Sequence, residues 1–210
     1  CLDEAIKLDG NYAHIWETKG SVFGKQGKYQ DAVDCFDKAI KLDGNNLYSL
    51  RNKGLALTKL GRWQDAVDCL DEAIKLDGNE WSTWAAKGAA LTTLYRWQDA
   101  VDCFDEAIKL DGNNFFHWRN KGVALAKLGR LQDAVDCLDE AIKLDGRDNV
   151  YVWINKGLVS AELGKYQDAI DCYDEAIKLD RNNANIWNMK SMALAKLGRL
   201  QDAVDCSDEI

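Results

Sequence analysis

The stretch QDAVDCLDEAIKLDG, residues 64–78, decides the fold because the chain repeats it. Close copies stand at 30–44, 98–112, 132–146 and 167–181, and partial copies at 1–10 and 201–210. Successive cysteines measure the period as 34, 34, 34, 34, 35 and 34 residues: Cys1, Cys35, Cys69, Cys103, Cys137, Cys172 and Cys206. A fixed period of this length indicates an array in which each repeat packs mainly on its neighbours.

Both halves of the repeat have helical periodicity. In the second half, the apolar residues that share one helix face are Ala66, Val67, Leu70, Ala73 and Ile74. The first half, from Tyr48 to Leu60, also gathers its apolar residues on one face. Each repeat is therefore predicted to be a pair of antiparallel helices of about 14 residues, which bury both apolar faces only when repeats stack.

Turn residues separate the predicted helices. Asn45 and Asn46 are suitable N-caps for the first helix, and Gly61 is expected to break it. Gly78 is predicted to be the left-handed residue that closes the second helix. Tyr95 replaces the glycine between the two helices of the next repeat, so a positive φ there would cost about 1 kcal/mol.

The order of large and small residues resembles the tetratricopeptide repeat and recurs in phase five times. In the first complete repeat it is carried by Trp16, Gly20, Phe23, Gly27, Ala32, Phe36 and Ala39. Where the family has Pro after Asp, this chain has Gly44, Gly78, Gly112, Gly146 and Arg181. A lysine also precedes each packing position: Lys19, Lys53, Lys87, Lys121, Lys156 and Lys190. The resemblance implies an all-α fold, an α-α superhelix (solenoid) of stacked antiparallel helix pairs with 34-residue repeats.

We expect residues 1–210 to form a single solenoid. Its predicted parts are a partial repeat at 1–12, holding only a second helix, full repeats at 13–46, 47–80, 81–114, 115–149 and 150–183, and a truncated sixth repeat at 184–210. The extra residue of the fourth repeat falls in a loop around Arg147–Asn149, where an insertion costs little. The chain is expected to be a fragment of a longer array, whose blunt apolar ends would favour end-to-end self-association.

Composition and motifs argue against several classes of function. The net charge of −8 opposes nucleic-acid binding, which needs a basic surface, and no apolar run is long enough to span a membrane. No signal peptide is recognisable. Equivalent cysteines of neighbouring repeats would lie roughly 10 Å apart, too far for disulfides, so we expect reduced thiols and a cytoplasmic location. Because phosphate-loop, HExxH and GxSxG motifs are absent, neither enzymatic activity nor a cofactor or metal site is expected.

The resemblance also implies where a ligand would bind. In tetratricopeptide repeat proteins the first helices line a concave groove, and the second helices, here bearing acidic residues such as Asp68 and Asp71, line the convex side. The implied groove residues are Tyr48, Arg51, Asn52, Leu55, Lys59, Phe116, Arg119, Asn120, Val123, Lys127, Tyr151, Asn155 and Leu158. Because this set is apolar and basic, it predicts a protein-protein interaction scaffold whose protein or peptide ligand carries acidic and apolar groups.

Other functions stay open at this point. Some family members grip a C-terminal carboxylate with a fixed set of Asn, Lys and Arg residues over three repeats. The matching places here supply Arg119 and Asn155, but Val123, Asn185 and Met189 stand where the other members of that set are needed. Two alternatives are a structural spacer, or self-associating repeat array, without ligand specificity, and the non-catalytic arm of a larger enzyme.

Overall fold

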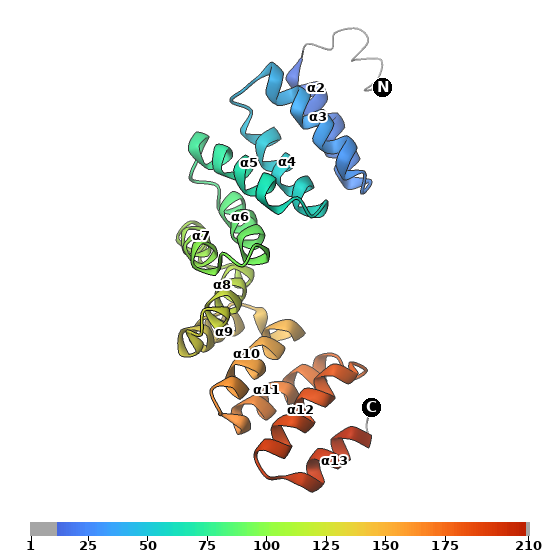
Figure 1. Ribbon diagram of the computed structural model, residues 1–210, viewed down its shortest axis with the longest axis vertical. Coiled ribbons are helices and arrows are strands. Elements are labelled where there is room, and N and C mark those ends of the chain that lie inside the picture. The colour runs from blue at the N-terminus through green and yellow to red at the C-terminus, as the bar shows by residue number, and fades with distance from the viewer. Residues whose placement is uncertain (1–11, 209–210) are drawn as a thin grey trace. The chain divides into compact units, whose positions relative to one another are not determined.

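The computed structural model describes residues 12–208, and over these residues it contains helices and turns but no strand. The expected partial repeat at 1–12 lies almost wholly outside the described residues. The helices are α2 (Ala13–Lys25), α3 (Tyr29–Leu42), α4 (Leu47–Lys59), α5 (Trp63–Leu76), α6 (Trp81–Thr93), α7 (Trp97–Leu110), α8 (Phe115–Lys127), α9 (Leu131–Lys143), the 3-10 helix η1 (Gly146–Asp148), α10 (Val150–Glu162), α11 (Tyr166–Leu179), α12 (Ala184–Lys196) and α13 (Leu200–Asp208) (Figure 1).

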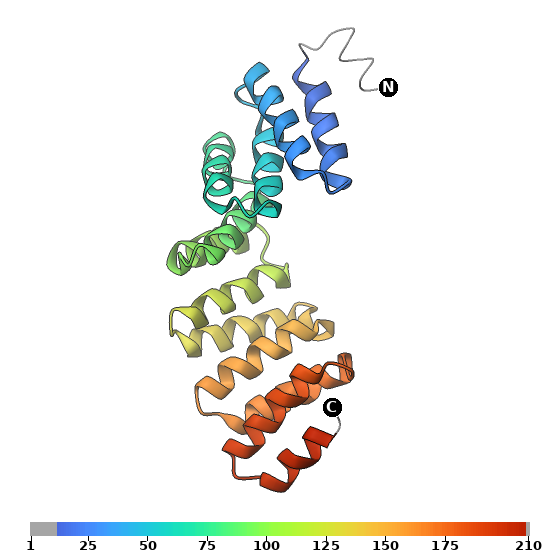
Figure 2. The same ribbon diagram turned by 45° about the vertical axis from the view of Figure 1, so that its right-hand side comes forward.

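The chain divides into two compact units, Cys1–Leu110 and Asp111–Ile210. In the described part of the first unit, α2 pairs with α3, α4 with α5 and α6 with α7; in the second, α8 pairs with α9, α10 with α11 and α12 with α13. Successive pairs pack through α3 on α4, α5 on α6, α9 on α10 and α11 on α12 (Figures 1 and 2). These stacked antiparallel pairs confirm the all-α, helical-repeat fold class. The repeat boundaries themselves stay predictions.

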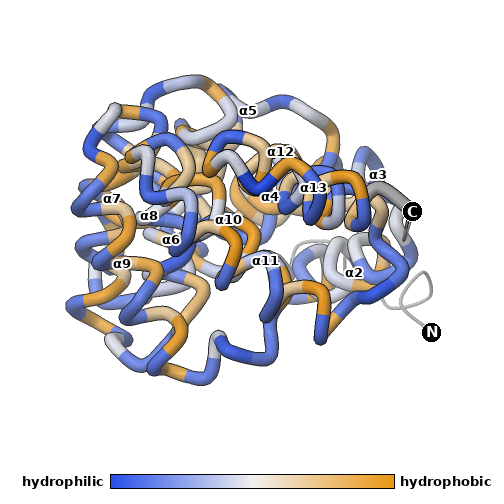
Figure 3. Tube along the Cα trace, turned by 90° about the horizontal axis from the view of Figure 1, so that it is seen from below, coloured by the Kyte–Doolittle hydropathy of each residue, from blue (hydrophilic) through white to orange (hydrophobic). Residues whose placement is uncertain are grey.

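Hydrophobic and hydrophilic residues are interspersed along the helices (Figure 3). In α5 the buried residues are Ala66, Val67, Cys69, Leu70 and Ala73, the same face that the sequence pattern indicates. The buried faces of α3, α7, α9 and α11 fall at the same places one or more periods away. Burial of this stripe drives each pair together and onto its neighbour.

A small residue on each first helix, glycine in all but the last of the described pairs, sets the distance within a pair. A Cβ added at Gly54 would lie 2.8 Å from Leu70 Cγ, and one added at Gly157 would lie 2.5 Å from Tyr173 Cε1. The same close approach joins Gly20 to Phe36, Gly88 to Phe104 and Gly122 to Leu138. In the last pair Ser191 replaces the glycine, and its hydroxyl donates a hydrogen bond to the carbonyl of Ala203, 2.8 Å away. The small residue therefore lets a large side chain of the second helix fill the interior of the pair.

Four of the lysines that precede a packing position join successive repeats within a unit. Lys87 Nζ lies 2.5 Å from Asp71 Oδ1 on the second helix of the preceding repeat, and also over the ring of Trp84 at 5.6 Å. The indole of Trp84 donates its N–H to the carbonyl of Gly78, 2.8 Å away, across the loop between repeats. The same ion pair recurs as Lys53–Asp37, Lys156–Asp139 and Lys190–Asp174. These lysines, which depart from the family pattern, thus make contacts between successive repeats.

The turns confirm the expectations for Asn46 and Gly61, correct the one for Gly78, and show the conformation of Tyr95. Asn46 caps α4, since its Oδ1 accepts a hydrogen bond from Ser49 N at 2.8 Å. Gly61 follows α4 with φ 75°, and Tyr95 has the same left-handed conformation with φ 59°. The prediction for Gly78 is wrong: its φ is not positive, because α5 ends in the extended residue Asp77 (φ −149°, ψ 107°) instead of a left-handed turn.

The extra residue of the fourth repeat changes how α9 ends. Asp145 takes a left-handed φ of 84°, and the 3-10 helix Gly146–Asp148 follows directly. Gly146 is buried, and a Cβ there would collide with the carbonyl of Ala141. The insertion is therefore absorbed in the loop before α10, and Asn149 still caps that helix by accepting from Tyr151 N.

The left-handed turns offer a test of backbone strain. Gly129 has φ 76°, and an added Cβ would meet no atom within 4 Å, so Gly129→Ala changes backbone preference alone. We expect this substitution to lower the free energy of unfolding by about 1 kcal/mol, measured from urea denaturation midpoints. Tyr95→Gly should shift stability in the opposite direction, by less, because it also removes the edge contact between Tyr95 and Trp97. An unchanged midpoint for Gly129→Ala would contradict the strain argument.

Candidate functional site

The first helices of the N-terminal unit line a groove of about 480 Å³, called the N-terminal groove below. Four of the predicted residues line it: Tyr48, Asn52, Leu55 and Lys59, all on α4. The other walls come from Ser21, Gly24 and Lys25 at the end of α2, from Tyr29 and Phe36 on α3, and from Ala86 and Ala89 on α6. A volume of this size is in the range of sites that enclose ligand side chains.

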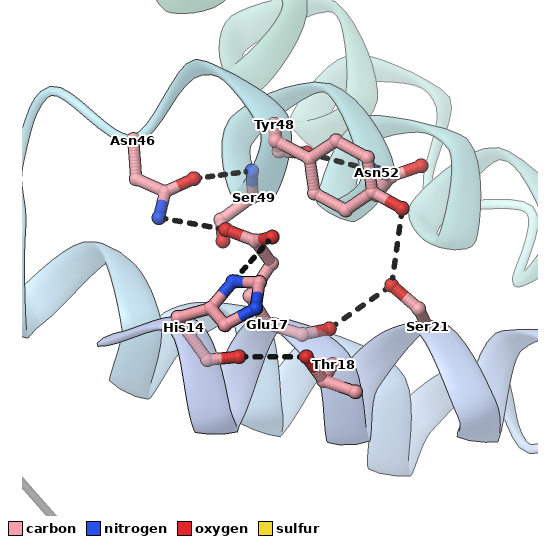
Figure 4. A network of polar contacts seen from close by, with 8 residues as sticks. All are labelled: His14, Glu17, Thr18, Ser21, Asn46, Tyr48, Ser49 and Asn52. Atoms are coloured by element: carbon pink, nitrogen blue, oxygen red, sulfur yellow. Dashed lines mark hydrogen bonds and ion pairs between the residues drawn. The ribbon is translucent and has the colours of Figure 1, made fainter. Parts of the chain in front are cut away.

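A polar network holds α2 and α4 together beside the N-terminal groove (Figure 4). Asn46 caps α4 and also donates through Nδ2 to Glu17 Oε2 at 3.1 Å. The hydroxyls of Ser21 and Tyr48 lie 3.3 Å apart, so the tyrosine ring is fixed at the groove edge. Asn52 donates to the carbonyl of Tyr48 at 2.8 Å, which uses one of its amide hydrogens within the helix.

Arg51, also predicted to face the groove, is engaged elsewhere. Its Nη1 lies 3.8 Å from Glu80 Oε2 and donates to Ser82 Oγ at 3.4 Å, which links α4 to α6. Its guanidinium also lies 5.4 Å from the centre of the Tyr48 ring. Arg51 does not line the N-terminal groove, and it supports Tyr48 from the side.

The C-terminal unit has two smaller hollows, called the C-terminal grooves below. The first, of about 110 Å³, brings together the predicted residues Val123, Lys127, Asn155 and Leu158 with Glu162. The second, of about 290 Å³, also contains Leu158 and Glu162, and is completed mainly by Met189, Met192 and Lys196. Both therefore combine an apolar floor with one lysine and one carboxylate.

The remaining four predicted residues do not line these hollows. Arg119 donates through Nη2 to Asn120 Oδ1 at 2.9 Å and lies 5.2 Å from the centre of the Phe116 ring. Burial lowers the pKa of Arg119, and the nearby Tyr151 opposes that shift. Tyr151 itself is 62% exposed. These side chains lie in the N-terminal halves of α8 and α10, outside the hollows. They contribute two aromatic rings, of Phe116 and Tyr151, and the guanidinium of Arg119.

The predicted groove set does not include the walls of the N-terminal groove that lie outside α4. Lys25 and Ser21 stand one period before Lys59 and Leu55, and Ala89 stands one period after Leu55. The periodic register is therefore a sequence signal that identifies them. The contribution of α6 comes from small residues, Ala86 and Ala89, which carry no signal of binding by residue type.

The cysteines of residues 12–208 are buried free thiols, and they do not form a reactive site. Burial raises the pKa of Cys103 from 9.0 to about 11, although Lys87 lowers it, and the pKa of Cys172 rises in the same way to about 11 beside Lys156. These thiols stay protonated at neutral pH, so they are poor nucleophiles and poor metal ligands. Within the described residues no cluster of three or more His, Cys, Asp or Glu side chains could hold a metal ion.

A search for membrane spans gives a negative result over residues 12–208: none of these helices combines the length and the apolar character that crossing a bilayer requires.

Comparison with known proteins shows the family. Models described as tetratricopeptide repeat match residues 13–46, 48–80, 86–149, 150–183 and 172–205. The chain therefore belongs to the tetratricopeptide repeat family, as its residue pattern predicted. No curated protein matches it by sequence.

Solved structures share the fold at low sequence identity. YrrB, described as a TPR protein with an unusual peptide-binding site, matches with a TM-score of 0.76 and 18% identity, over 95% of this chain and 98% of YrrB. MamA 41-end from Desulfovibrio magneticus RS-1 matches with a TM-score of 0.77 and 19% identity, over 81% and 96%. Pseudomonas aeruginosa pilF matches with a TM-score of 0.77 and 15% identity, over 93% and 88%. At these identities the likeness establishes the fold alone.

The network beside the N-terminal groove predicts that Asn46 and Asn183, which both stand at helix N-cap positions, contribute differently to stability. Asn46→Ala removes the cap of α4 and the bond to Glu17, so we expect the free energy of unfolding to fall by about 1 to 2 kcal/mol in urea denaturation. The matched control is Asn183→Ala, because Asn183 begins α12 without a side-chain capping bond. If both variants lose the same free energy of unfolding, the capping bond of Asn46 and its bond to Glu17 add no stability, and the explanation fails.

The buried thiols predict an alkaline loss of stability. Folding raises their pKa, so the stability they contribute is complete below the unfolded value of 9.0 and is lost as the pH rises toward about 11. The shift corresponds to on the order of 2 kcal/mol for each thiol. Urea denaturation of the Cys103→Ala, Cys172→Ala double variant should show a smaller drop between pH 8 and pH 11 than the parent chain. Identical pH profiles would contradict this explanation.

Proposed function

We propose that this chain is a protein-protein interaction scaffold that holds a linear segment of a partner protein against its first helices. Membership of the tetratricopeptide repeat family supports the scaffold. The single observation that carries the finer proposal is that eight of the sequence-predicted groove residues line solvent-open hollows, four in each unit. Exposed leucines that line these hollows supply the apolar contact, and the lysines and asparagines of the same linings supply polar contacts.

Leu55 and Leu158 are the best positions for a test. They occupy the same place in different repeats, they are 43% and 41% exposed, and they line hollows in separate units. Because they are already exposed, replacement by glutamate should have little effect on folding while placing a charge where an apolar side chain of the partner would lie.

The experiment is a quantitative pull-down from the source cell's lysate with the Leu55→Glu, Leu158→Glu double variant. Leu76→Glu, Leu179→Glu is the matched control, since these leucines are both 43% exposed but end α5 and α11, away from the hollows. We expect the amount of each specific partner recovered with the groove variant to fall tenfold or more. The control variant should recover the same amounts as the parent chain. If both variants retain the same partners, the proposal fails.

A further inference from the structure

The N-terminal groove has a shape that suits one bulky apolar side chain. Tyr48 and Leu55 form one wall and are fixed by the helix and by the bond from Tyr48 to Ser21. From α6, only the methyl groups of Ala86 and Ala89 contribute to the lining. The groove is therefore open and largely apolar, and an aromatic or branched aliphatic side chain would bury its surface there.

The charge of the N-terminal groove is one-sided. Lys25 and Lys59 are the charged residues of its lining, and no carboxylate lines it. Both lysines are exposed, and neither has an ion-pair partner within residues 12–208, whereas Lys53 on α4 and Lys87 on α6 are paired with aspartates. In a chain of net charge −8, this groove is a local positive surface.

The C-terminal grooves do not share this property. One contains Lys127 with Glu162, and the other contains Lys196 with the same Glu162. Glu162 occupies the repeat place of Lys59, so a single difference in residue type removes the excess of positive charge. The unit with the N-terminal groove is thus the one that should favour an acidic ligand.

The spacing of the two lysines limits the form of that ligand. They stand at equal places on α2 and α4, and adjacent packed helices lie roughly 8 to 10 Å apart. An extended chain covers this distance in about three residues. Two carboxylate side chains three residues apart can therefore each meet one ammonium group.

We propose that the N-terminal groove binds an internal, extended segment of a partner protein that inserts one bulky apolar side chain and sets flanking Asp or Glu side chains against Lys25 and Lys59. This inference rests on the proposed function and names the ligand chemistry of one of its grooves. The affinity comes from the buried side chain, and the charge pairs select the acidic segment and speed its association.

The test uses fluorescein-labelled peptides with blocked ends and fluorescence anisotropy on the full chain. The probe is GSEDWLEDSG, and its two controls are GSQNWLQNSG, which replaces carboxylates with amides, and GSEDSSEDSG, which removes the apolar side chains. We expect the probe to bind at least tenfold more tightly than either control. Its affinity should fall as salt is raised from 50 to 500 mM, because the charge pairs are exposed to solvent.

Matched variants locate the site. Lys25→Gln, Lys59→Gln should weaken the probe about tenfold, and Lys127→Gln, Lys196→Gln in the C-terminal unit should leave it unchanged. Equal binding of the amide peptide, equal loss in the two lysine variants, or no detectable binding would each overturn the inference. A free C-terminus that binds more than tenfold better than the blocked one would also overturn it, in favour of a terminal carboxylate.

The experiments distinguish a failure of this ligand class from a failure of the proposed scaffold function. If the leucine-to-glutamate variant of the hollows loses its cellular partners while the acidic probe fails, the scaffold stands and only this ligand class is wrong. If that variant loses no partner, the scaffold itself fails, whatever the probe does.

Discussion

The close approach of a glycine on each first helix to a large side chain on the second is the contact on which the rest of the structure depends. Gly54 against Leu70 and Gly157 against Tyr173 leave no room for a Cβ, so the two helices of a pair are held at a fixed distance. That distance sets where the outer face of the first helix lies. Since the second helices are packed on the first helix of the next repeat, the first-helix face is left to line the grooves.

The contacts between repeats are made by polar side chains that the helical pattern alone would assign to the solvent-exposed surface. Lys87 reaches back to Asp71, and Trp84 closes the loop before its own helix through its indole N–H. The same pair recurs in both units, for instance as Lys190 with Asp174. Each ion pair on a partly exposed surface adds little free energy by itself. Their effect is to fix the register in which one repeat stacks on the next, and so the side chains that neighbouring first helices bring together.

The sequence was sufficient for the elements and for the register, because both follow from a period that the chain repeats almost without change. Two residues of the groove set that it proposes, Leu55 and Leu158, line hollows, and it marks Tyr95 as the place where a positive φ would be costly. It could not show that Arg51 bonds across to α6, because the register of two stacked repeats is a three-dimensional property. The prediction that Gly78 is left-handed was wrong, because the chain leaves α5 through Asp77, which is extended.

Photo-cross-linking tests the central claim, a partner segment held on the first-helix face of the N-terminal unit, most directly. The probe would be the acidic peptide GSEDWLEDSG with benzoylphenylalanine in place of its tryptophan, irradiated with the full chain, followed by mass spectrometry of the cross-linked residues. The groove geometry predicts cross-links within α2, α4 and α6, where Ser21, Leu55 and Ala89 line the hollow. Cross-links confined to α5 and α7, or to the C-terminal unit, would contradict it.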